Sequence, residues 1–189
     1  HPAMSDQTPS FDTSWLREGQ GRPPELKWAF RGDTAVVSMA LSRESGDVFV
    51  CEESSTLYRL TRSGKIAAVT HPRSPLSQLA WSEDGLWGYG IDSDKTVIRF
   101  DRNLQVDWEF ESHDDILTLA TSPFGHHVVI THSDATNLVL NERKRKIAKF
   151  ETVRPLQYVK FCGTEPVLFG SAENGLLCCH NLVGAQLWQ

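Results

Sequence analysis

The chain repeats itself at an offset of 40 residues, and this periodicity limits its possible folds more than any other feature. The repeats align in columns without gaps. One column holds small residues: Ser42, Ser82, Ser122 and Cys162. Two others hold hydrophobic residues: Val36, Leu76, Ile116 and Leu156, and Met39, Leu79, Leu119 and Val159. A further column is Ala40, Ala80, Ala120 and Lys160. Such agreement without insertions is improbable by chance and predicts four copies of one structural unit.

Each unit is predicted to contain four antiparallel strands. The segments between turns are short and rich in β-branched and aromatic residues, which disfavours helices. In the second unit we expect strands over Leu76 to Trp81, Trp87 to Ile91 and Val97 to Phe100, and a fourth that carries Trp108. Turns such as Ser82-Glu83-Asp84-Gly85 separate them, since glycine supplies the positive φ that these turns need.

Hydrophobic residues occur on both faces of the expected strands. In the first unit, Val36 and Ala40 lie on one face, and Val37, Met39 and Leu41 lie on the other. A β-sandwich would keep a polar face on most strands, whereas each blade of a β-propeller packs between two neighbours. The sequence therefore predicts an all-β protein, a β-propeller of four gapless four-stranded antiparallel blades, over about residues 31–70, 71–110, 111–150 and 151–189.

The second unit resembles a WD-type repeat. Phe100-Asp101 stands where that family has its Trp-Asp pair, and the other units depart from the pair at Leu60-Thr61, Leu140-Asn141 and His180-Asn181. The fourth strand, Gln105 to Phe110, is more similar to the quinoprotein-like propellers, whose blades often end in a docked Trp. The resemblance covers residues 26–189 and implies the fold class rather than an activity, because propellers host enzymes and scaffolds alike.

The resemblance also implies structural roles for particular residues. In WD-type blades a His before the first strand donates a hydrogen bond to an Asp in a later turn, and His113 and Asp134 match that placement. Asp94 occupies the equivalent turn of the second blade. The tryptophan column of the fourth strands, with Trp28, Trp108 and Trp188, is expected to dock against the blades.

The sequence does not determine how a ring of four blades would close. Residues 26–30 are expected to form a spare strand before the first blade. We favour a half-propeller that dimerises into an eight-bladed ring, since an open half-ring would expose apolar blade faces. The chain could instead be a fragment of a longer propeller, or a four-bladed monomer with the spare strand as a clasp. Residues 1–25 are expected to be a cloning remnant followed by a flexible arm or linker.

Binding residues are expected in the loops before each first strand and between the second and third strands, which line one end of a propeller channel. These loops mix acids, bases and imidazoles, which suits a polar or charged segment of a protein or peptide. The candidates are Arg31, Asp33, His71, Arg73, His113, Asp114 and Arg154.

Two clusters of basic residues are interpreted as surface features. Arg143 to Lys146 are expected at a solvated hairpin tip, because the run lacks interleaved aromatic residues. His126, His127 and His132 are expected to be surface histidines.

Composition argues against several classes of partner. The chain has 19 Lys and Arg against 24 Asp and Glu, a net charge of −5, which disfavours nucleic acid and anionic membranes. The sequence shows no transmembrane segment and no secretory signal, and the cysteines are interpreted as reduced core thiols, so we expect a cytoplasmic protein.

No motif for catalysis or metal binding is recognisable. Asp114 and Asp115 are adjacent and diverge, and Cys178, Cys179 and His180 alternate between the faces of a strand. We therefore expect no enzyme activity, no metal and no cofactor. The sequence predicts a non-catalytic interaction or scaffold module that forms a homodimer. The alternative is a small-molecule or quinone-binding domain, which the quinoprotein-like resemblance implies.

Overall fold

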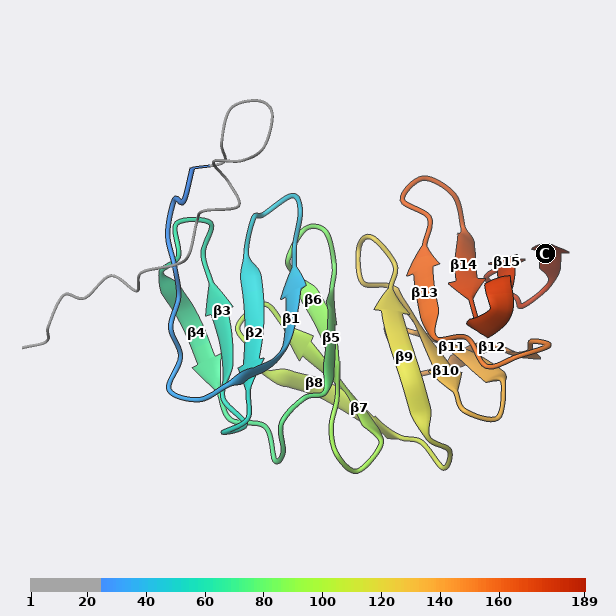
Figure 1. The fold of residues 1–189 in the computed structure, drawn as a ribbon, viewed down its shortest axis with the longest axis horizontal. Coiled ribbons are helices and arrows are strands. Elements are labelled where there is room, and N and C mark those ends of the chain that lie inside the picture. The colour runs from blue at the N-terminus through green and yellow to red at the C-terminus, as the bar shows by residue number, and fades with distance from the viewer. Residues whose placement is uncertain (1–24) are drawn as a thin grey trace, which may run out of the picture. The chain divides into compact units, whose positions relative to one another are not determined.

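The computed structural model describes residues 25–189 and contains four separate four-stranded antiparallel sheets, each in chain order (Figure 1). The first blade contains β1 (Val36–Leu41), β2 (Val48–Glu52), β3 (Leu57–Leu60) and β4 (Ile66–Thr70). The second contains β5 (Gln78–Trp81), β6 (Trp87–Ile91), β7 (Thr96–Asp101) and β8 (Val106–Glu111). The third contains β9 (Ile116–Thr121), β10 (His127–His132), β11 (Thr136–Asn141) and β12 (Lys146–Glu151). The fourth contains β13 (Tyr158–Phe161), β14 (Val167–Ser171), β15 (Leu177–Asn181) and β16 (Gln186–Trp188), with a short 3-10 helix (Glu173–Gly175).

The expected all-β architecture of four gapless blades is therefore confirmed, and each sheet stays within one residue of its predicted unit. Among the described residues, no helix has the length and apolarity to cross a bilayer.

The spare strand expected over residues 26–30 is wrong. These residues form no strand, and none of the four sheets includes them. A strand needs a neighbour that satisfies its backbone hydrogen bonds, and apolar residues alone do not supply one. Residues 25–31 belong to a separate N-terminal unit. The expected cloning remnant and arm lie outside the described residues, except for Glu25.

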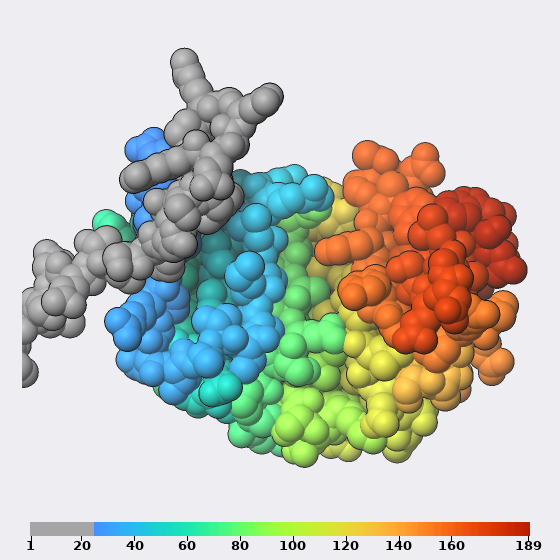
Figure 2. All heavy atoms as spheres, in the orientation of Figure 1, coloured from blue at the N-terminus to red at the C-terminus, as the bar shows by residue number. Residues whose placement is uncertain are grey.

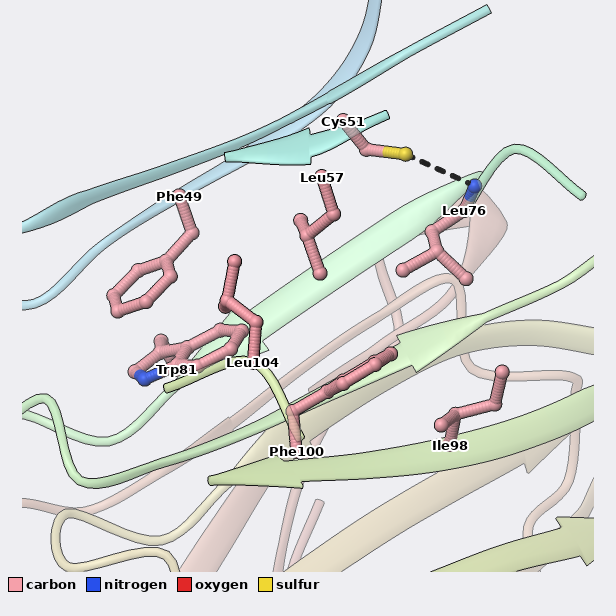
Figure 3. Close-up of a cluster of buried hydrophobic side chains, with 8 residues drawn as sticks. All are labelled: Phe49, Cys51, Leu57, Leu76, Trp81, Ile98, Phe100 and Leu104. Atoms are coloured by element: carbon pink, nitrogen blue, oxygen red, sulfur yellow. Dashed lines mark hydrogen bonds between the residues drawn. The ribbon is translucent and has the colours of Figure 1, made fainter. Parts of the chain in front are cut away.

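The hydrophobic core lies between blades. In Figure 3, Phe49 and Leu57 of the first blade meet Trp81, Ile98 and Phe100 of the second. The rings of Phe49 and Trp81 stack with their centroids 3.5 Å apart. Two similar clusters join the second blade to the third and the third to the fourth. This arrangement explains why the strands are apolar on both faces, since both faces of an internal blade are buried.

A buried arginine also joins the second and third blades. The Arg99 guanidinium forms an ion pair with Asp107 and donates to the Tyr89 hydroxyl at 3.1 Å. It lies 3.8 Å from the centroid of the Trp87 ring. Arg99 also donates to the carbonyl of Gly125 in the third blade at 3.4 Å. Aromatic rings and hydrogen-bond acceptors together compensate for the burial of this cation.

Neighbouring blades contact each other through their inner strands as well. β1 packs beside β5, β5 beside β9, and β9 beside β13. Figure 2 shows the blades side by side in chain order, from blue to red. Within the described part of the chain, β13 does not pack beside β1 in this way. The four blades therefore do not close into a ring within one chain.

The hairpin between the third and fourth strands explains the departures from the Trp-Asp pair. In the second blade, a side-chain oxygen of Asp101 accepts hydrogen bonds from the backbone of Asn103 at 2.8 Å and Gln105 at 2.9 Å. Asn141 and Asn181 make the same pairs of bonds, and the Thr61 hydroxyl makes one of them. All four residues supply an acceptor oxygen, so the turn is kept although the aspartate is not.

The same hairpin places one residue per blade in the left-handed region. The four positions are Gly64, Leu104, Lys144 and Gly184, with φ of 79°, 63°, 61° and 84°. Glycine adopts this conformation without strain, whereas a side chain costs about 1 kcal/mol. At this hairpin, the second and third blades therefore carry a backbone strain that the first and fourth avoid.

Candidate interaction surface

The predicted binding loops lie at one end of the blades. Each sheet is an antiparallel meander, so the end where its first strand begins also holds the turn from the second to the third strand and the end of the fourth. The segments that follow β4, β8 and β12 therefore share this end, which we call the loop end.

The loop end is rich in exposed charged and imidazole side chains. The exposed predicted residues there are Asp33, His71, Arg73, His113, Asp114 and Arg154. Arg31 is also exposed, but it belongs to the separate N-terminal unit. The structure thus brings six of the seven candidates to the same end of consecutive blades.

Several of these side chains are held in defined contacts. Arg73 forms an ion pair with Glu109, which raises the pKa of the arginine. Arg154 donates to the backbone carbonyl of Glu173 at 3.1 Å. His71 Nδ1 lies 3.5 Å from the Thr56 hydroxyl. Exposed ion pairs are worth less than about 1 kcal/mol, so a partner can exchange them for its own groups at little cost.

A histidine network occupies the third blade, but its members differ from those expected. His132 is buried at the end of β10, with Nε2 3.0 Å from the Ser112 hydroxyl and Nδ1 3.0 Å from the Thr136 carbonyl. A carbonyl can only accept, so Nδ1 donates to Thr136. The expectation that His132 is a surface residue is therefore wrong.

The expected hydrogen bond between His113 and Asp134 is likewise not formed among the described residues. Asp134 instead accepts from the backbone and the hydroxyl of Thr136, at 2.9 and 2.6 Å, and these bonds lower the pKa of its carboxyl. His132 lies beside Ser112, and His113 is exposed.

The serine and histidine of this network have the spacing of a nucleophile and its base. However, a backbone carbonyl orients the ring, and the Ser112 hydroxyl is also 2.9 Å from the Asp114 carbonyl. The adjacent pocket has a volume of about 100 Å³, below the roughly 300 Å³ of ordinary small-molecule sites. We therefore interpret the network as a brace between the loop after β8 and the turn after β10.

The predicted structural role of Asp94 belongs to a different residue. In the second blade the turn acceptor is Asp92, which binds the backbone of Asp94 and Thr96 at 2.9 Å, so the turn role assigned to Asp94 belongs two residues earlier. Asp92 and His132 are 40 residues apart and therefore occupy the same position in successive repeats. This alignment could have revealed that both residues are polar members of the turn after the second strand.

The tryptophans differ in their environment. Trp108 donates from its indole nitrogen to the Glu142 carbonyl at 2.9 Å and lies edge-on to Tyr89. Trp188 is half exposed, with its ring centroid 6.0 Å from that of Phe169. Trp28 is half-buried in the N-terminal unit.

A central hollow with a volume of about 640 Å³ is lined by the inner strands of all four blades. Polar side chains of this wall bond to one another, since Thr118 donates to Gln78 and Gln78 donates to the Leu117 carbonyl.

The four cysteines are free. Cys51, Cys178 and Cys179 are buried, and burial raises the pKa of each thiol. Hydrogen bonds from Thr164 and Glu165 lower the pKa of Cys162. Across residues 25–189, no three His, Cys, Asp or Glu side chains converge in a metal-sized group.

The sequence matches no protein-family model and no curated protein. The fold is similar to that of many solved structures, among them the crystal structure of RRP9 WD40 repeats. That match has a TM-score of 0.69 at 16% sequence identity and covers 84% of this chain. It covers 52% of the other chain, so the present chain spans about half the length of that structure. At this identity the likeness establishes the fold, and the four sheets are blades of a WD-like β-propeller.

Proposed function

We propose that this chain of WD-like blades is a non-catalytic scaffold that binds a protein or peptide at its loop end. The observation that carries the proposal is the row of exposed charged and imidazole side chains at the same end of consecutive blades, each at the margin of a rigid sheet. Sites of this kind need no reorganisation of the backbone, which lowers the entropic cost of binding.

The chemistry of the row suggests what the partner offers. Arg73 and Arg154 present planar guanidinium groups that bind carboxylates in a two-pronged geometry. Asp33 and Asp114 are exposed in the loops at the same end of the blades, and their carboxylates suit a basic group. We therefore propose a polypeptide segment with alternating acidic and basic side chains as the ligand, rather than a nucleic acid, which the net charge of −5 disfavours.

Two further properties belong to the proposal. The chain pairs with a second copy to complete an eight-bladed ring, since an unpaired terminal blade leaves apolar side chains in water. It acts in the cytoplasm, where free buried thiols such as those of Cys51 and Cys178 are typical.

The test is selection of a random peptide library against the purified chain, followed by titration of the selected peptides. Arg73→Ala is expected to weaken their binding at least tenfold. Arg43→Ala is the matched control, because Arg43 is equally exposed, at 71%, and also pairs with a glutamate, but lies at the opposite end of the blades. Equal losses for the two variants, or no selected peptide, would overturn the proposal.

A further inference from the structure

The fourth blade carries a face that, in the other three blades, is covered by the next blade. We propose that this face docks onto β1 of a second copy of this chain. The inference rests on the pairing stated under the proposed function and assigns the residues that form the contact. We call this face the forward face, because it is the side of each blade that points along the chain.

The forward face contains one residue from each strand, aligned across the sheet. In the first blade the row is Ala40, Phe49, Arg59 and Ala68. In the second it is Ala80, Tyr89, Arg99 and Trp108. In the third it is Ala120, Val129, Val139 and Ala148. In the fourth it is Lys160, Phe169, Cys179 and Trp188. The same positions therefore build the same face four times.

In the first three blades this face packs into the core shared with the following blade. Phe49 lies in the first cluster, Tyr89 in the second, and Val129 and Val139 in the third. In the fourth blade, Trp188 is half exposed and Lys160 is exposed. The face retains two aromatic rings, Phe169 and Trp188, in contact with each other. Phe169 is half-buried and Trp188 is half exposed, and an aromatic pair that is partly exposed on a face covered in the other three blades indicates a docking surface.

A second set of contacts also points to a following blade. Polar side chains of one blade donate to backbone carbonyls at the start of the next inner strand. Ser38 donates to the Leu76 carbonyl at 2.5 Å, Gln78 to the Leu117 carbonyl at 2.5 Å, and Thr131 to the Leu156 carbonyl at 2.8 Å. Tyr158 is the fourth-blade equivalent of Ser38 and Gln78, and it is 72% exposed. Its hydroxyl is a donor at the position from which the first and second blades bond their successors, whereas the third blade makes this bond from Thr131.

The complementary surface is the inner strand of the first blade. Leu79 and Trp81 of the second blade pack against the first blade, and one repeat earlier the same positions are Met39 and Leu41. Met39 is 71% exposed and Leu41 is 59% exposed. Val50, beside Met39 in the sheet, is already buried, whereas Met39 and Leu41 of β1 are open. The occupant is therefore β1 of a second copy, which continues the packing of β1 on β5, β5 on β9 and β9 on β13.

Lys160 distinguishes this contact from the three within the chain. Alanine occupies its position in the other three blades. In the proposed contact the aliphatic stem of Lys160 lies along Met39, and its ammonium group reaches the water of the central hollow, which both residues line. A glutamate at this position is too short to reach water and would bury its charge, whereas an alanine restores the residue of the other blades.

The experiment is sedimentation equilibrium of the full chain over a range of concentrations, with substitutions at exposed sites on both surfaces. Lys160→Glu and Met39→Glu are each expected to raise the dimer dissociation constant at least tenfold. Lys160→Ala is expected to leave it unchanged or lower it. Lys149→Glu, the same charge reversal at an exposed lysine of β12, is expected to have no effect.

The outcomes separate this inference from the proposed function. A dimer that resists both Lys160→Glu and Met39→Glu overturns the assignment of the two faces while pairing itself stands. A chain that remains a monomer at every concentration overturns both the pairing and the faces. Peptide binding at the loop end, measured on the same samples, reports on the scaffold role independently, because Arg73 and Arg154 lie outside both faces.

Discussion

The ion pair of Arg99 and Asp107 is expected to contribute much more to stability than an exposed ion pair such as that of Arg43 and Glu83. The side chain of Arg99 is 4% exposed and that of Asp107 is 38% exposed. Arg99→Met keeps much of the volume but removes the contact with the Trp87 ring and the bonds to Asp107 and Tyr89. We expect a loss of about 2 kcal/mol, less than for a fully buried pair, because water can reach the released carboxylate.

Asp107→Ala is expected to cost more, about 3 kcal/mol, although Asp107 is the more exposed partner. This substitution leaves the Arg99 cation buried without a negative charge, and an unpaired buried charge costs more than an exposed one. The double variant is expected to lose less than the sum of the single variants, with a coupling energy of about 2 kcal/mol. Equilibrium unfolding in urea at low salt measures all four free energies.

The control is the same cycle for Arg43 and Glu83, whose side chains are 71% and 27% exposed. The coupling energy of this pair is expected to stay below about 1 kcal/mol, as is usual for surface pairs. If both cycles give the same coupling energy within 0.5 kcal/mol, on the order of the error of such cycles, burial is not what makes the Arg99 pair strong. A smaller loss for Asp107→Ala than for Arg99→Met would contradict the argument from the unpaired cation.

Three further outcomes are expected. Lys144→Gly should raise the free energy of unfolding by about 1 kcal/mol, because it relieves a left-handed φ of 61° at an exposed residue. Leu104→Gly should lower the free energy of unfolding, because the Leu104 side chain is buried. Thermal melts that shift both variants in the same direction would refute this reasoning. Burial lowers the pKa of His180, so the unfolded chain binds the proton more readily, and stability should fall as the pH drops below about 6.5. His180→Leu introduces the residue that the first and third blades have at this position, Leu60 and Leu140. In urea titrations at several pH values, this variant should show a weaker dependence of stability on pH. The pH dependence that remains should come from His127, because burial also lowers the pKa of His127. The purified chain should show the absorption spectrum of protein alone, and a bound chromophore would favour the quinoprotein-like alternative instead.

Much of the fold could be predicted because the repeat carries redundant information. A single apolar segment of four to six residues does not identify its own sheet, but the same segment at residues 36, 76, 116 and 156 does. The strand expected over residues 26–30 was predicted wrongly because it rested on a single segment. These residues match the tryptophan column, but none of the four sheets in the described part of the chain includes them, and hydrogen-bond pairing is not encoded in one segment.

The loop end was only partly predictable. Exposure of His71, Arg73 and Arg154 follows from their place in loops, but the partners of each side chain depend on backbone geometry that spacing does not specify. His132 illustrates this limit. The strand period places it on a face, but only the assembled blade shows that Ser112 and Thr136 enclose its ring. Asp92 was missed for a related reason, since two acidic residues in one turn look equivalent until one accepts the backbone bonds.

Because the hydrophobic core lies between blades, the chain can gain or lose residues without disrupting its core only in complete 40-residue units. Every cluster takes its side chains from two successive blades, so an isolated 40-residue segment has no interior of its own. Inserting or deleting a whole segment adds or removes one shared interior and leaves the remaining ones intact. A change of any other length shifts the strands after it out of alignment. Such a chain is therefore expected to evolve by duplication and loss of complete units.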